Sequence, residues 1–87
     1  MVSYEVRLTR SAEKELGDLP KSIVPVLWGR IKALASEPKP KRSRKLKGAE
    51  KAYRLRIRDY RVVYTIDDEG KVVIVTAVRH RKEVYRG

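Results

Sequence analysis

The chain has 87 residues, of which 41% are hydrophobic and 38% are charged, so we expect one small domain that spans residues 1–87 around a single thin core. It has no cysteine and one histidine, which excludes disulfide bonds and thiolate metal sites, and we expect neither a metal ion nor a small-molecule cofactor. Its net charge of +11 favours a polyanionic partner, and its longest apolar run, residues 23–28, is too short to cross a bilayer, so we expect a cytoplasmic protein with no membrane partner.

The beginning of the chain is predicted to form a strand and a short helix. Residues 3–8 alternate polar and apolar side chains, which is typical of a half-buried strand. Thr9 can cap the helix that follows, because its hydroxyl can accept a hydrogen bond from a backbone N–H of the first turn. Ala12, Leu16 and Leu19 recur at helical spacing and predict the buried face of this helix.

A second, longer helix is expected to begin between Pro20 and Ser22 and to end at Glu37, which a proline follows. If Ser22 is the N-cap, Pro25 falls in the first turn, where backbone N–H groups have no helical partner. If the helix begins earlier, we expect a kink at Pro25. The stripe that faces the core is predicted to consist of Ile23, Leu27, Arg30, Ile31 and Leu34.

The second half of the chain is predicted to be a basic loop followed by a β-meander. We expect a short strand at residues 45–47 within the loop, and three longer strands in the β-rich runs 52–58, 61–66 and 72–78. The expected α+β fold is therefore a two-helix hairpin packed on one face of a mostly antiparallel sheet, in the order β-α-α-β-β-β.

The short link between residues 57 and 61 decides which way the arginines of the first hairpin point. We expect a two-residue loop there, at residues 58–59 or 59–60. Both alternatives place Arg54, Arg56 and Arg61 on one face of the sheet, because side chains alternate between faces along a strand.

The next turn decides on which face Arg79 lies. We expect a three-residue loop over residues 68–70, with Gly70 in the left-handed conformation and a bulge beside it. This loop would pair Asp67 with Lys71 and would place Arg79 on the same face as the other three arginines. A loop of two or four residues would place Arg79 on the opposite face.

Two segments carry the whole excess of positive charge. Residues 39–61 contain eleven basic and two acidic side chains, and residues 79–86 contain four basic side chains and one acidic one. Guanidinium groups gathered on one face repel one another and stay protonated, so such a cluster suits a ligand with several negative charges, such as a phosphodiester chain. The alternative is that surface ion pairs with nearby acids neutralise the arginines. The four acids available cannot balance both basic segments, and they are Asp59, Asp67, Asp68 and Glu83.

Two stretches of the sequence form a combined pattern, YRLRIRDYRVVY at residues 53–64 and VTAVRHRKEVYR at residues 75–86. Together with residues 9–12 and the Leu19-Pro20 turn, this pattern resembles the RelE toxins of the RelE/ParE superfamily over essentially the whole chain. The resemblance implies a RelE-like fold and a toxin of a toxin–antitoxin pair that cleaves messenger RNA in the ribosomal A site. The partners it implies are the messenger RNA, the ribosome and an acidic antitoxin protein.

The resemblance also assigns catalytic positions to five residues of this chain: Arg54, Arg56, Arg61, Arg79 and Tyr85. The first two positions are lysines in the best-known members of the family, and arginine weakens any mechanism in which a lysine is the base. Phosphate binding and stabilisation of the transition-state charge are unaffected by this difference. We expect further contacts with RNA phosphates from basic side chains nearby: Lys45, Lys47, Arg58 and Arg81.

The simplest metal-free route to RNA cleavage is attack by the ribose 2′-OH on the adjacent phosphorus, which yields a 2′,3′-cyclic phosphate and a 5′-OH. Arginines can hold the phosphate in line and stabilise the charge of the transition state, but they cannot act as the base. Tyr85 is the predicted base or orienter of the 2′-OH, because a ring of arginines favours its phenolate. His80 is the alternative base, although a regular strand sends it to the face opposite Arg79.

Two other functions remain open at the level of the sequence. A ParE-like toxin that binds DNA gyrase would share the fold, although the combination of Arg61, Arg79 and Tyr85 argues against it. A basic RNA-binding module is the non-enzymatic alternative, but an aromatic content of 7% without phenylalanine argues against a stacking platform for single-stranded RNA. Trp28, the only tryptophan, is either a residue at the edge of the core or part of an apolar groove for an antitoxin helix.

Overall fold

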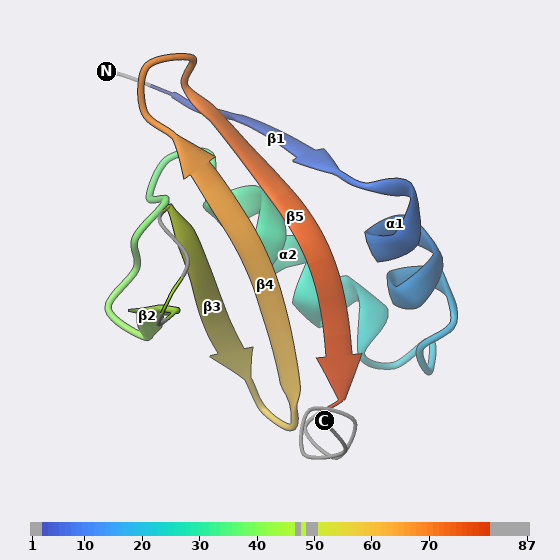
Figure 1. Ribbon diagram of the computed structural model, residues 1–87. Helices are drawn as coiled ribbons and strands as arrows, with labels where there is room; N and C mark the ends of the chain where they lie inside the picture. The colour runs from blue at the N-terminus through green and yellow to red at the C-terminus, as the bar shows by residue number, and fades with distance from the viewer. Residues whose placement is uncertain (1–2, 47, 49–50, 81–87) are drawn as a thin grey trace.

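The computed structural model describes residues 3–46, 48 and 51–80, and its elements follow the expected order, including a short strand in the basic loop. The elements are β1 (Glu5–Leu8), α1 (Arg10–Gly17), α2 (Val24–Ala33), β2 (Ser43–Lys45), β3 (Ala52–Ile57), β4 (Tyr60–Asp67) and β5 (Val72–His80). The strands form one sheet in the order β1-β5-β4-β3-β2 (Figure 1). In this sheet β1 runs parallel to β5, and the other described neighbours are antiparallel.

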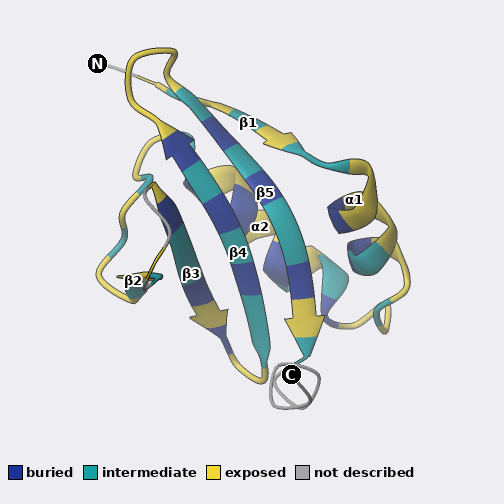
Figure 2. Cartoon of the chain, viewed as in Figure 1, coloured by how far each residue is buried: buried dark blue, intermediate teal, exposed yellow. Residues whose placement is uncertain are grey.

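Both helices pack against the same face of the sheet, and Figure 1 shows α2 lying behind β4 and β5. We call this the inner face and the opposite one the outer face. Along β3, β4 and β5, buried positions alternate with more exposed ones, so the period of two directs the apolar side chains into the core (Figure 2). These observations confirm the predicted α+β fold. No helix within residues 3–46, 48 and 51–80 is long and apolar enough to span a membrane.

Thr9 caps α1 as predicted. Its hydroxyl accepts a hydrogen bond from the backbone N–H of Ala12 at 3.2 Å. Ala12 and Leu16 are buried in the core, whereas α1 ends at Gly17 and Leu19 is half-buried in the turn beyond it. The predicted buried face is therefore confirmed for the residues that are helical.

The predicted boundaries of the second helix are wrong at both ends. α2 begins at Val24, after a turn at residues 21–23, rather than between Pro20 and Ser22, although Pro25 lies in its first turn as expected. It ends at Ala33 rather than at Glu37. The backbone N–H groups of residues 34–36 bond to carbonyls three residues back, so the chain tightens into 3₁₀-type turns before it reaches Glu37.

The stripe of α2 that faces the core is confirmed except at one position. Arg30 is exposed, because its long side chain can keep its charged end in water at the rim of the core. The other predicted positions of the stripe are buried, and they are Ile23, Leu27, Ile31 and Leu34.

Tyr64 is the largest of the fully buried side chains and closes the core beneath β4. Its hydroxyl donates a hydrogen bond to the carbonyl oxygen of Pro38 at 2.9 Å, which satisfies the polar end of the buried side chain. Burial also raises the pKa of Tyr64 above its ordinary value. The loop after α2 is thereby tied to the centre of the sheet.

The β3–β4 hairpin confirms the predicted two-residue loop. Arg58 and Asp59 form the loop, so Arg56 pairs with Arg61 across the two strands. Arg58 has a φ of 56°, which matches the left-handed conformation that tight hairpin loops require.

The prediction for the turn between β4 and β5 is wrong. Its loop has four residues, 68–71, so Asp67 pairs with Val72 rather than with Lys71. Lys71, not Gly70, has the positive φ, at 55°. The side chain of Asp67 explains the difference, because its Oδ1 accepts a hydrogen bond from the backbone N–H of Gly70 at 3.1 Å and builds an Asx-type turn.

A bulge in β5 restores the predicted face for Arg79. The pairing register shifts by one residue between Val63 and Tyr64 of β4, which leaves Thr76 of β5 as the extra residue. The four-residue turn reverses the face of the side chains that follow it, and the bulge reverses it again. Arg79 therefore pairs directly with Arg61, on the predicted face but through two deviations that cancel.

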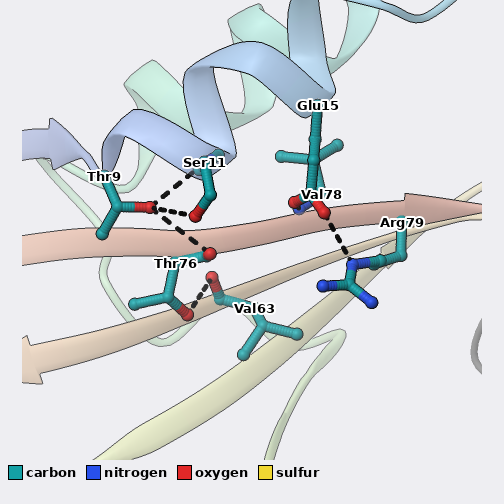
Figure 3. Close-up of polar contacts among 8 residues, drawn as sticks. Thr9, Ser11, Glu15, Val63, Thr76, Val78 and Arg79 are labelled. Carbon is teal, nitrogen blue, oxygen red and sulfur yellow. Dashed lines mark hydrogen bonds and ion pairs between the residues drawn. The ribbon is translucent and has the colours of Figure 1, made fainter. Parts of the chain in front are cut away.

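Hydrogen bonds from two sides hold the bulge residue. The hydroxyl of Thr9 donates to the carbonyl oxygen of Thr76 at 3.4 Å, and the hydroxyl of Thr76 donates to the carbonyl oxygen of Val63 at 3.3 Å (Figure 3). Thr9 therefore serves both as the cap of α1 and as a support for the bulge.

Candidate active site

Three arginines form a row across the three central strands of the sheet, close to the β3–β4 loop. Arg56 of β3 pairs with Arg61 of β4, and Arg61 pairs with Arg79 of β5. Directly paired residues project from the same face at about 5 Å between their Cβ atoms, so the three side chains share the outer face. We call these residues the arginine row. The prediction that they lie on one face is confirmed by the register.

A second pair of arginines lies beside this row. Arg54 is two positions before Arg56 on β3, and it pairs with Arg44 of β2. Both therefore project from the outer face. Arg54 is a predicted site residue, whereas Arg44 is one that the sequence reasoning missed.

The misplaced short strand explains why Arg44 was missed. β2 spans Ser43–Lys45, two residues earlier than predicted, and Lys47 lies outside the described residues. Lys45 pairs with Tyr53, so strand alternation places it on the face opposite Arg44. Lys45 therefore does not join the arginines, and its neighbour Arg44 lies beside Arg54 instead.

The second pair of arginines opens into a basic cavity of about 460 Å³. Arg58, in the hairpin loop, joins this cavity as one of the predicted phosphate ligands. The cavity is lined only by cationic side chains among the described residues, and they are Lys41, Arg42, Arg44, Arg54, Arg56 and Arg58. These positive charges repel one another, and an anion with several negative charges neutralises them best.

Arg61 holds the most enclosed position in the arginine row. Arg61 is half-buried, whereas Arg56 and Arg79 are exposed. Its Nε is buried and has no hydrogen-bond partner among the described residues. An unpaired buried donor is unfavourable in the free protein, so this N–H favours a ligand that supplies an acceptor oxygen.

Two of the four acids that could neutralise the arginines, Asp67 and Asp68, form hydrogen bonds elsewhere. Asp67 bonds within its own turn, as described above. Asp68 accepts a hydrogen bond from the hydroxyl of Tyr4 at 2.7 Å, and this bond holds the pKa of Asp68 below its usual value and raises the pKa of Tyr4. Glu83 lies outside the described residues.

Arg79 instead has an acidic partner from the first helix. Its Nε lies 2.8 Å from Oε2 of Glu15 in α1, and Oε1 of Glu15 accepts a hydrogen bond from the backbone N–H of Val78 at 2.9 Å (Figure 3). The sequence reasoning missed Glu15, because no local pattern connects a helix near the beginning of the chain to the end of the last strand.

The two candidates for the base have different outcomes. His80 pairs with Tyr60 on the face opposite Arg79, and its ring stands edge-on to that of Tyr60 at 5.1 Å between centroids. His80 therefore lies away from the arginine row, and this agrees with the prediction from strand alternation. Tyr85 lies outside the described residues, as does the predicted phosphate ligand Arg81.

An apolar groove lies away from the arginines, between β1 and the two helices. It has a volume of about 540 Å³, and Trp28 lines it with 40% of its surface exposed. Lys32 holds its Nζ 5.9 Å from the centre of the indole ring, which places a positive charge beside the groove. The apolar residues that line the groove are Val6, Leu8, Leu16, Val24 and Trp28.

Comparison with known proteins identifies the family. Residues 6–85 match the family described as the ParE toxin of the type II toxin–antitoxin system parDE. Toxin RelG of Mycobacterium tuberculosis is 39% identical over 88 residues, which cover 95% of this chain and 97% of RelG. A chain of the toxin–antitoxin complex RelBE2 from the same organism has a TM-score of 0.81 at 33% identity, and the match covers 93% of this chain and 94% of that one. The isolated E. coli RelE toxin has a TM-score of 0.79 at 30% identity, with 97% and 93% covered.

The fold is thus that of a toxin of a type II toxin–antitoxin system. Within that class, the chain belongs to the RelE family of the RelE/ParE superfamily. The resemblance seen in the sequence is confirmed.

Proposed function

We propose that this toxin is a metal-independent endoribonuclease that cleaves messenger RNA in the ribosomal A site, and that it acts in the cytoplasm. The observation that carries the proposal is the arginine row, in which three strands present guanidinium groups side by side on the outer face. The transition state of phosphodiester cleavage carries additional negative charge, and fixed guanidinium groups stabilise that charge.

The proposed reaction begins with attack by the ribose 2′-oxygen on the adjacent phosphorus. The bond between phosphorus and the 5′-oxygen breaks, the 2′-OH proton passes to a base, and the 5′-oxygen takes up a proton. The products are a 2′,3′-cyclic phosphate and a 5′-OH. In this scheme the arginine row binds the non-bridging oxygens and holds the phosphate in line, and the buried Nε of Arg61 gains the acceptor that it lacks.

The arginines cannot be the base, because guanidinium groups stay protonated. His80 lies on the opposite face of β5 from Arg79, so we propose Tyr85 rather than His80 as the base or orienter of the 2′-OH. Since the arginine row can bind a phosphate but cannot accept its proton, we expect ordering of the substrate by the ribosome to supply much of the rate.

The basic cavity extends the proposed site along the RNA. Arg54 belongs both to this cavity and to the predicted catalytic set, and Arg44 lies directly beside it. A strand whose scissile phosphate sits on the arginine row would therefore place a neighbouring phosphate at Arg44 and Arg42. Such contacts add binding energy that depends strongly on salt, without participating in the chemistry.

We further propose an acidic antitoxin protein as the partner that silences the toxin. Solved relatives include complexes of RelE with RelB from M. tuberculosis and Pyrococcus horikoshii, which supports this partner. An amphipathic antitoxin segment can place apolar side chains in the groove at Trp28 and carboxylates over the arginine row. Occupation of the row by carboxylates would exclude the RNA phosphates.

The test of the function is primer extension on a translated message, with the purified toxin and programmed ribosomes. We expect cuts in phase with the codons, cleavage about 100-fold slower by Arg61→Ala, and little cleavage of the same RNA without ribosomes. Rapid cleavage of naked RNA would contradict the dependence on the ribosome. In a parallel assay with gyrase and plasmid DNA, loss of supercoiling without cuts in the message would show a ParE-like gyrase poison. Neither effect would show a binding module.

A further inference from the structure

We infer that Glu15 of α1 is a positioning residue for the arginine row, and that it fixes the guanidinium of Arg79 in the orientation that receives a phosphate. This inference rests on the proposed function. It assigns a role in RNA cleavage to a helix that contributes no side chain to the outer face.

The two oxygens of the Glu15 carboxylate have different partners. Oε1 accepts the hydrogen bond from the backbone N–H of Val78 at 2.9 Å, and Oε2 lies 2.8 Å from Nε of Arg79 (Figure 3). The bond to the backbone anchors the carboxylate to β5 itself. The ion pair therefore links Arg79 to a group that is already held in place, which lowers the entropy lost when the pair forms.

The path of the chain explains why Val78 has an N–H to offer. β1 pairs with β5 up to Leu8 and Val75, and the backbone N–H of Thr9 still donates to the carbonyl oxygen of Val75 at 2.9 Å. Beyond this point the chain turns into α1, so the edge of β5 loses its neighbouring strand. Glu15 supplies the acceptor that a longer β1 would have supplied.

The contact at Nε leaves the other edge of the guanidinium open. Figure 3 shows both terminal nitrogens of Arg79 on the side away from the Glu15 carboxylate, and neither has a partner among the described residues. Two parallel N–H groups on one edge match two oxygens of a phosphate. Held at Nε, Arg79 presents this edge to a ligand without first searching through its rotamers.

Repulsion within the row makes such a restraint necessary. Arg79 pairs directly with Arg61, and half of its side chain is exposed, so an unrestrained Arg79 would move away from the neighbouring positive charge into water. A carboxylate that only neutralised charge would weaken phosphate binding. A carboxylate that positions Arg79 increases the rate of the chemical step, and the two roles therefore differ in their kinetic signatures.

The experiment compares Glu15→Gln with Glu13→Gln, which makes the same change in the same helix at an exposed residue. Glutamine keeps the shape and an acceptor for the N–H of Val78 but loses the charge that holds Arg79. In cleavage on programmed ribosomes we expect Glu15→Gln to lower kcat by about 10-fold or more, without an increase in KM. Glu13→Gln should stay within about twofold of the wild type. An unchanged kcat for Glu15→Gln would overturn the inference.

A second background separates positioning from a general loss of stability. In Arg79→Lys the side chain keeps its charge but has no Nε–H, so Glu15→Gln should cause no further loss of kcat there. An equal loss in the wild type and in Arg79→Lys would show that Glu15 acts through the fold, and would overturn the inference.

A readout without RNA distinguishes failure of the inference from failure of the proposed function. We expect the NMR order parameter of the Arg79 Nε–H group to be high in the wild type and in Glu13→Gln, and to fall in Glu15→Gln. If the wild type does not cleave messenger RNA, the proposed function fails, and this order parameter still decides whether Glu15 fixes Arg79. The same order parameter in all three proteins would contradict the inference.

Discussion

Arg61 lies between Arg56 and Arg79 in the arginine row, and it differs from both in being half-buried. The stem of its side chain can pack against the sheet while the guanidinium stays at the outer surface. Its buried Nε has no partner among the described residues, so this N–H group is already free to bind an anionic ligand before the ligand arrives. Substitution here should affect the chemistry far more than the fold.

We expect Arg61→Ala to lower the rate of cleavage on ribosomes by about 100-fold, the range seen when one charge-stabilising donor is removed. Arg61→Lys should retain part of the rate, because it keeps the charge and loses the planar fork. Thermal unfolding should show both variants folded. Growth arrest by Arg61→Ala at the wild-type level, with normal expression, would contradict the role of this residue.

Arg44 is expected to act on binding alone. Arg44→Ala should reduce the affinity for single-stranded RNA and lower the slope of log affinity against log salt by about 0.7, the value for one phosphate contact. Lys21→Ala removes an exposed charge on the helical side and is the matched control. Fluorescence anisotropy at several salt concentrations measures both slopes. Equal slopes for the two variants would remove the basic cavity from the RNA path.

At the scale of elements, the end of β5 depends on α1. The bulge at Thr76 determines the face on which Arg79 lies, and Thr9 supports the bulge while it caps the helix. Glu15, two turns further along, holds Val78 and Arg79. The helix and its cap therefore hold the end of β5, which carries Arg79 on the outer face, through contacts at the edge that β1 leaves unpaired.

Thr9→Ala tests this coupling. We expect it to lower the free energy of unfolding by about 1 kcal/mol, because the helix loses its cap and the bulge loses a donor. Thr9→Ser keeps the hydroxyl and should remain within a few tenths of the wild type. Urea denaturation followed by circular dichroism measures both values. A Thr9→Ala protein as stable as Thr9→Ser would show that the hydroxyl contributes nothing.

At the scale of the whole molecule, the arginine row and the basic cavity are separated from the apolar groove. The outer face and the loop before β3 carry the arginines, whereas the groove at Trp28 lies between β1 and the helices. A net charge of +11 on 87 residues makes the free protein self-repelling, so a partner of opposite charge is favoured over a second copy. An acidic segment long enough to reach both regions would bind by charge and by apolar contact together.

The kinetics of this complex follow from the separation. With the acidic product of the neighbouring gene, we expect the on-rate to fall steeply between low and high salt and the off-rate to change little. Charge steers the encounter, and apolar contacts in the groove hold the complex once it has formed. Stopped-flow measurements at two ionic strengths measure both rates. Binding that leaves cleavage unchanged would contradict an antitoxin that covers the arginine row.

Local patterns in the sequence were sufficient to predict the order of the elements, the cap at Thr9, the buried positions of α2 and the common face of Arg54, Arg56 and Arg61. They succeed because side-chain periodicity and a two-residue loop are properties of neighbouring residues. Only the tertiary structure decided the four-residue turn, the bulge at Thr76, the register of β2 and the pairing of Glu15 with Arg79. Each of these depends on which distant groups satisfy a backbone N–H, a carbonyl or a charge, and chain connectivity alone leaves that choice open.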